Sequence, residues 1–110
     1  MGYTINDKTK QITLIRGDTL KMQVSIFINK QPYTPASGDV IRFAMKQTTS
    51  SSKVLIHKII PNDTLILHLL PSDTKRLAFG NYVYDIEITF ENGDVDTFIT
   101  GKLRLEPEVE

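Results

Sequence analysis

The sequence predicts an all-β protein, a two-sheet antiparallel β-sandwich of about seven strands, and three observations support this. Apolar and polar residues alternate along several short stretches, which is the period-2 pattern of a strand with one buried face. These stretches recur at regular intervals with turn residues between them. The last two stretches are joined by Asn92-Gly93, and this pair is the strongest short signal for a β-hairpin.

The composition is that of one domain. The chain has 110 residues, of which 40% are hydrophobic, enough for a single core. We expect a flexible arm over residues 1–10, one domain over 11–106 and an acidic tail over 107–110. With 13 basic and 13 acidic residues the net charge is +0, so neither nucleic acid nor a membrane is expected as a partner. The chain has no cysteine, and its start lacks the apolar core of a signal peptide.

The last hairpin predicts its own register. Asn92 and Gly93 fit the two loop positions of a type I′ turn, because both tolerate positive φ. Counting outward from this loop places Tyr84 opposite Gly101, where the ring would cover a strand glycine. The apolar residues of both arms then share one face, as a hairpin over a core requires. The expected pairs are Phe90 with Val95, Ile88 with Thr97, Ile86 with Ile99, Tyr84 with Gly101 and Tyr82 with Leu103.

Five strands are expected before this hairpin. They run over residues 11–15, 20–28, 41–45, 54–60 and 65–70. The fourth and fifth are joined by a short turn and are apolar on both faces, which favours a place inside the sandwich or against a partner. A single helical turn near residues 72–77 follows, capped by Ser72 or Asp73.

The segment from Leu77 to Tyr82 resembles the corner before strand F of immunoglobulin-like domains. In such a corner a glycine, here Gly80, lets the chain turn. A tyrosine two residues later, here Tyr82, ties its hydroxyl back to the backbone. The pattern therefore favours an immunoglobulin-like sandwich, although Tyr82 also fits the simpler interpretation of a core aromatic.

Two motifs have a chemical and a structural interpretation. His57 would face His68 if their strands paired, and two imidazoles on one rung can hold a metal, although zinc normally takes at least three protein ligands. We expect a surface or edge rung and no bound metal. Arg16-Gly17-Asp18 is the tripeptide that integrins recognise, but it is also ordinary turn chemistry, and the turn is the expectation here.

Acidic residues gather on the outward face of the last hairpin. They include Asp85 and Glu87, with Phe98 predicted across from Glu87 as an exposed aromatic. Paired carboxylates can act as acid and base or bind calcium, but alternation places these on an open strand face. We therefore expect Asp85, Glu87 and Phe98 to form a contact surface. The sequence contains no nucleophile motif or phosphate loop, so we expect neither enzyme activity nor a cofactor.

Three stretches together resemble a known family. They are Ile15 to Thr19, Gly38 to Lys46, and Leu70 to Glu87 with its Leu-Pro-Ser-Asp-Thr and Gly-Asn-Tyr-Val-Tyr-Asp segments. This layout is similar to small immunoglobulin-like structural proteins of tailed phages and prophages of Gram-positive bacteria, such as the N-terminal domain of baseplate upper proteins. The resemblance covers about residues 11–109.

The resemblance implies a virion component of the baseplate, a tail fibre or the head decoration, made in the bacterial cytoplasm. Its partners would be copies of itself, as a homo-oligomer, or other phage structural proteins. The alternative is a carbohydrate-binding or adhesion module on the same fold. That module would need exposed rings, for which the chain offers only Phe27, Tyr33, Phe79 and Phe98, and it has no tryptophan.

Overall fold

The computed structural model describes residues 3–6 and 8–108. The described residues form ten strands and one short helix, so the expectation of an all-β fold is confirmed, while the expected number of strands, about seven, is too low. The elements are β1 (Tyr3–Ile5), β2 (Ile12–Ile15), β3 (Leu20–Gln23), β4 (Phe27–Ile28), β5 (Gln31–Pro32), β6 (Val40–Lys46), β7 (Ile56–Ile60), β8 (Ile66–Leu69), α1 (Pro71–Thr74), β9 (Gly80–Thr89) and β10 (Val95–Glu106).

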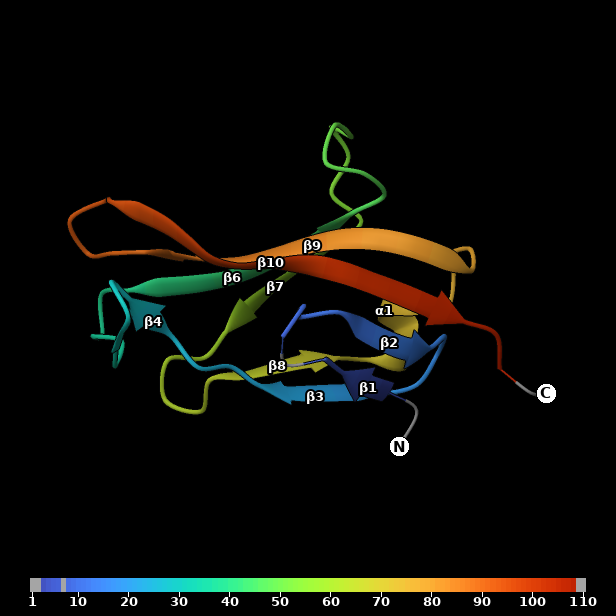
Figure 1. Cartoon of the computed structure of the whole chain (residues 1–110), viewed down its shortest axis with the longest axis horizontal. Coiled ribbons are helices and arrows are strands. Elements are labelled where there is room, and N and C mark those ends of the chain that lie inside the picture. The colour runs from blue at the N-terminus through green and yellow to red at the C-terminus, as the bar shows by residue number, and fades with distance from the viewer. Residues whose placement is uncertain (1–2, 7, 109–110) are drawn as a thin grey trace.

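The strands form one large sheet and two small ones. The large sheet has six strands in the order β1-β2-β10-β9-β6-β7, and it is antiparallel except between β2 and β10. A two-stranded sheet of β3 and β8 lies against one face of the large sheet (Figure 1). The short strands β4 and β5 pair with each other. The Tyr3 hydroxyl donates to the Lys21 carbonyl oxygen over 2.9 Å, which ties β1 at the edge of the large sheet to β3.

The core lies between the large sheet and the β3–β8 pair. Alternate residues of β6 and β9 point into it from one side, and Leu67 and Leu69 of β8 point into it from the other. The alternation predicted over residues 20–28 is present, because Leu20, Met22, Val24 and Ile26 are all buried. Strand pairing is nevertheless interrupted between Gln23 and Phe27, so this predicted strand is β3 followed by the short β4.

The hairpin of β9 and β10 has the predicted register near its base and a different one near its tip. Tyr84 pairs with Gly101, Tyr82 with Leu103 and Ile86 with Ile99, as expected. At the tip, however, Val95 pairs with Thr89, because the loop has three residues instead of two. The Phe90 N–H donates to the Asp94 carbonyl oxygen over 2.7 Å, and only Gly93 has positive φ, so the predicted type I′ turn is wrong.

A β-bulge at Phe98 restores the register. Thr97 pairs with Glu87 and Ile99 with Ile86, so Phe98 is the one extra residue on β10. The extra residue of the loop and the extra residue at the bulge offset each other, so the pairs from Ile99 onward are the predicted ones. Between the loop and the bulge, each side chain of β10 points to the face opposite to the predicted one. Val95, predicted to point inward, is 58% exposed, and Phe98, predicted to point outward, packs against the core.

The strands β7 and β8 do not pair, although they are consecutive. β7 pairs with β6 in the large sheet, and β8 pairs with β3 in the other layer. The connection therefore crosses between the layers, and Asn62 anchors it by donating to the carbonyl oxygens of Ala36 (2.9 Å) and Asp39 (2.8 Å). The physical reason is that Ile56 and Ile60 of β7 and the buried leucines of β8 enclose one core from opposite sides.

The corner before β9 forms as predicted. The Tyr82 hydroxyl donates to the Ala78 carbonyl oxygen over 2.7 Å, and Gly80 adopts a φ of 134° that favours glycine. The helical turn is α1, shorter than the predicted range 72–77. Its first N–H groups are satisfied in part by Asp73, whose carboxylate accepts from the Leu70 N–H over 2.7 Å, while Ser72 is exposed.

The structure describes only part of the predicted N-terminal arm and of the predicted C-terminal tail. Residues 1, 2 and 7 of the predicted arm and residues 109–110 of the predicted tail lie outside the described residues. Within the arm, Tyr3–Ile5 is a strand of the large sheet and not a loose segment. Within the tail, the Glu108 carboxylate lies 2.9 Å from the Arg16 guanidinium and is held against the domain.

Candidate interaction surfaces

The structure separates the three residues predicted to form one contact surface. Asp85 and Glu87 lie on the outer face of the large sheet, where they pair with Ala44 and Arg42 of β6. Phe98 lies on the inner face because of the bulge. The predicted mixed surface of acids and an exposed ring is therefore wrong as a single patch, and the two faces carry two different surfaces.

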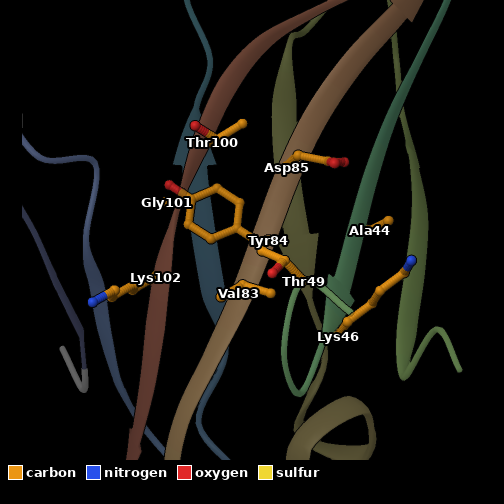
Figure 2. A pocket seen from close by; sticks show the side chains of 9 residues that line it. All are labelled: Ala44, Lys46, Thr49, Val83, Tyr84, Asp85, Thr100, Gly101 and Lys102. Carbon is orange, nitrogen blue, oxygen red and sulfur yellow. The ribbon is translucent and has the colours of Figure 1, made fainter. Parts of the chain in front are cut away.

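The outer surface is a shallow trough over β6, β9 and β10. Figure 2 shows Asp85 on β9 between Ala44 on one neighbouring strand and Thr100 on the other. Lys46 and Lys102 lie at opposite borders, and the cavity measures about 390 Å³. The small side chain of Ala44 leaves the floor low, so the trough is open to a partner and encloses nothing.

The charged residues of the trough are Lys46, Asp85 and Lys102, so both signs are present. Beside the trough on the same face of the sheet, the Glu87 carboxylate lies 3.3 Å from the Arg42 guanidinium, which also donates to the Thr89 hydroxyl over 3.1 Å. Burial raises the pKa of Asp85, the charge of Glu87 raises this pKa further, and the ammonium of Lys46 lowers it. A surface with both signs of charge fits a polar protein partner better than a phosphate backbone, which would need cations throughout.

The inner surface is an apolar cleft, which we call the β3–β10 cleft. It measures about 350 Å³, and it is lined by residues of β1, β3 and the bulged part of β10 together with Lys10, Val24, Ser25, Phe27 and Tyr84. Phe98 and Ile99 are half-buried on one side of it, and Phe27, on another, is 55% exposed. The two charged residues that line it are both lysines, Lys10 and Lys21.

The cleft exists because the strands beside it are paired on one side only. β2 pairs with β10 over residues 103–106, so residues 95–102 of β10 have no second partner strand within the described part of the chain. Likewise, β3 pairs only with β8 among the described strands. The layer containing β3 is thus too narrow to cover the inner face at the bulge.

Sequence reasoning missed Asp39, a buried carboxylate that joins the loop before β6 to the loop between β9 and β10. Asp39 accepts hydrogen bonds from the Tyr33 hydroxyl, from the Ala36 N–H (2.9 Å) and from the Glu91 N–H (3.1 Å). The hydrogen bond from Tyr33 is the main cause that lowers the pKa of Asp39, and the same bond raises the pKa of Tyr33. The signal available in the sequence was a Ser-Gly-Asp turn, since aspartate bonds to nearby backbone in such turns.

The two motifs with a chemical interpretation adopt structural arrangements. His57 on β7 pairs with Ala44, and His68 on β8 pairs with Lys21, so the predicted rung of two imidazoles is absent. The described residues contain no group of three or more potential metal ligands. The Arg16 guanidinium donates a hydrogen bond to the Leu77 carbonyl oxygen (3.1 Å) and forms a salt bridge with Glu108. It also lies over the ring of Phe79, 4.1 Å from the ring centroid.

The four rings considered for sugar binding do not form one platform. Phe27 and Phe98 line the β3–β10 cleft. Tyr33 packs edge-on against Phe90 with centroids 5.5 Å apart. Phe79 lies under Arg16 and directly precedes β9, and β9 begins at the end of the molecule away from β4 (Figure 1).

The comparisons give no relative for this chain: no family model matches the sequence, and no curated protein or solved structure matches the chain. Within the described residues, no helix has the length and apolar character needed to cross a bilayer. The function is therefore inferred from the surfaces described above and from the sequence motifs.

Proposed function

We propose that this chain is a structural component of the virion of a tailed phage or prophage, in the baseplate, a tail fibre or the head decoration. It acts by assembling with other protein chains, copies of itself among them, and not by catalysis. The observation that carries the assembly role is the hairpin of β9 and β10, the longest element of the chain. Over residues 95–102, β10 has a partner strand on one side only in the described structure, next to the apolar β3–β10 cleft.

The proposal includes an immunoglobulin-like sandwich as the fold. In such sandwiches the corner tyrosine stands near the start of strand F, between strands C and G, and strands B and E pair in the other sheet. In this chain Tyr82 stands near the start of β9, which lies between β6 and β10, while β3 pairs with β8. The sheet order supports this assignment, and so does the resemblance of Gly80 to Glu87 to the phage proteins.

The surfaces of the domain suit assembly with proteins. The outer trough offers charges of both signs, and the inner cleft, on the opposite face, offers apolar side chains together with two lysines. Interfaces between proteins combine apolar and polar groups, and the cleft contains both.

Purified phage particles test the proposal directly. After induction of the host's prophages and gradient purification of the particles, mass spectrometry should find this chain in a fixed ratio to the other particle proteins. The genes beside its own should encode a terminase, a portal or tail proteins. A chain absent from the particles, encoded among genes with none of these products, would overturn the proposal.

A further inference from the structure

We propose that the β3–β10 cleft is the docking site for the hairpin tip of a second copy of this chain. The tip comprises residues 91–96, which include Glu91, Asp94, Val95 and Asp96. This inference rests on the proposed function, because it names one of the partners that an assembling virion protein would bind. It adds the two surfaces that meet and the charged residues that make their contact specific.

The tip carries uncompensated negative charge. Between Leu77 and Gly101 the sequence has five acidic residues and no lysine or arginine. Glu87 is paired with Arg42, but none of the salt bridges within the described residues involves Glu91, Asp94 or Asp96. The chain as a whole has a net charge of +0, so the negative tip is matched by positive charge elsewhere on the molecule.

The cleft carries the complementary pattern. Its lining is mainly apolar, and the two charged residues among it are Lys10 and Lys21. Neither lysine takes part in a salt bridge within the described residues. On the tip, Asp96 pairs with the buried Ile88 and Asp94 lies opposite Phe90, so both carboxylates lie on the face of β10 opposite to the exposed Val95. The negative charge of the tip thus complements a cleft whose charged residues are both lysines.

The size and the strand geometry favour a tip over an added strand. A cleft of about 350 Å³ holds a few side chains. The bulge at Phe98 interrupts the regular spacing of backbone groups on β10, and bulges on edge strands hinder the pairing of a further strand. Contact through the side chains of a hairpin tip does not need that edge to be regular.

Tip and cleft are different surfaces of one chain, so their contact is head-to-tail. Such contacts close into rings or extend as filaments, and every copy offers both a free tip and a free cleft until closure. Light scattering should therefore show a mass that rises with concentration above that of the monomer. Because the contact is charged, the association should weaken as the salt concentration rises.

Charge reversal tests the pairing with two variants that keep the fold. The cleft variant combines Lys10→Asp with Lys21→Glu, and the tip variant combines Asp94→Lys with Asp96→Lys. Aspartate suits position 10, since Lys10 has a φ of 61° and aspartate tolerates this conformation better than most residues. Each variant alone should associate at least about tenfold more weakly than the wild type, because like charges meet at the contact.

Mixing provides the decisive measurement. In an equimolar mixture each tip meets an oppositely charged cleft, so association should return, as it should in a chain that carries all four substitutions. The controls are Lys53→Glu and Asp63→Lys, which reverse exposed charges away from both surfaces and should change nothing. Circular dichroism and urea unfolding would verify that every variant is folded.

Two results would overturn the inference. One is a wild type that stays monomeric at all concentrations, and the other is an oligomer whose association the reversed charges do not weaken. Either result leaves the proposed function standing if the chain is still found in purified particles. Conversely, a chain that self-associates through these charges but is absent from particles would remove the virion role alone.

Discussion

Single hydrogen bonds fix the places where this chain changes direction. The Tyr82 hydroxyl closes the corner before β9 by donating to the Ala78 carbonyl oxygen, and Tyr84 covers Gly101 while donating to the Lys10 carbonyl oxygen. A Cβ added at Gly101 would lie 2.7 Å from that carbonyl oxygen, so the glycine allows three segments to meet. At the other end, Asp39 gathers Tyr33, Ala36 and Glu91 around one carboxylate.

Tyr82→Phe should lower the free energy of unfolding by about 1 kcal/mol, the net value of one hydrogen bond made by a buried group. Tyr82 is only 4% exposed, so water does not readily replace the lost donor at the Ala78 carbonyl oxygen. Urea unfolding at neutral pH measures the change. Tyr3→Phe is the matched control, because its hydroxyl bonds to Lys21 in an exposed setting, and its loss should cost much less. Equal effects of the two substitutions would contradict the role given to the corner.

Asp39 should make stability depend on pH in the acid range. Its pKa is lowered in the folded state, first by the hydrogen bond from Tyr33. The stabilisation is therefore complete above the ordinary aspartate pKa of about 4 and is lost as the pH falls through the lower folded value. The difference in urea midpoint between wild type and Asp39→Asn should thus be largest near pH 7 and shrink in acid. Asp63→Asn, in an exposed loop, is the matched substitution for comparison.

At the scale of elements, the hairpin of β9 and β10 shows how a local turn and a distant bulge determine one register together. The loop contains one residue more than the two-residue turn that Asn92-Gly93 predicts, and Phe98 supplies one extra residue on β10. The shifts cancel, so the base of the hairpin keeps its predicted pairs. Between loop and bulge they expose Val95 and direct Phe98 into the cleft.

Gly93 provides a test of this loop. It has a φ of 95°, and an added Cβ would meet nothing within 4 Å, so a substitution there acts through backbone conformation alone. Gly93→Ala should cost about 1 kcal/mol or somewhat more, the usual penalty for a side chain in the left-handed region. Gly93→Asn should cost less, because asparagine tolerates this region. Thermal unfolding of the two variants would measure the order, and an alanine variant as stable as the wild type would contradict the loop conformation.

At the scale of the whole molecule, a wide sheet and a narrow one enclose a single core. The six-stranded sheet is covered by only two paired strands, so one part of its inner face stays open as the β3–β10 cleft. The molecule is elongated, with extents of 46 × 30 × 25 Å. An elongated shape with an acidic tip and a cleft lined in part by two lysines suits the head-to-tail contact proposed above.

Neighbouring isoleucines on β7 test the two-layer core. Ile60 is fully buried between the layers, whereas Ile59 is 57% exposed on the opposite face. Ile60→Ala should lower the free energy of unfolding by about 2–5 kcal/mol, because it leaves a cavity in the core. Ile59→Ala should change it by less than about 0.5 kcal/mol. Denaturant unfolding compares the two, and similar losses would mean that β7 does not face the core as described.

The sequence by itself determined the features that depend on neighbours along the chain. Alternation identified the buried faces of β3, β6 and β9 as far as Ile88, and the spacing of Gly80 and Tyr82 identified the corner, because these patterns act within a few residues. It identified no single buried face for β7, which was predicted to be covered on both faces but lies at a sheet edge with Ile59 exposed. The acidic residues near the hairpin tip were also visible, although the predicted loop, with two residues, placed Val95 on the wrong face.

Only the tertiary structure decided which strands became neighbours. His57 and His68 are separated because β7 and β8 joined different layers, a choice made by burying both sets of apolar residues in one core. The bulge that moves Phe98 offsets the extra residue of the hairpin loop, and no signal in the local sequence marks it. The cleft likewise reflects the unequal widths of the two layers, which is a property of the packed chain and not of any single segment.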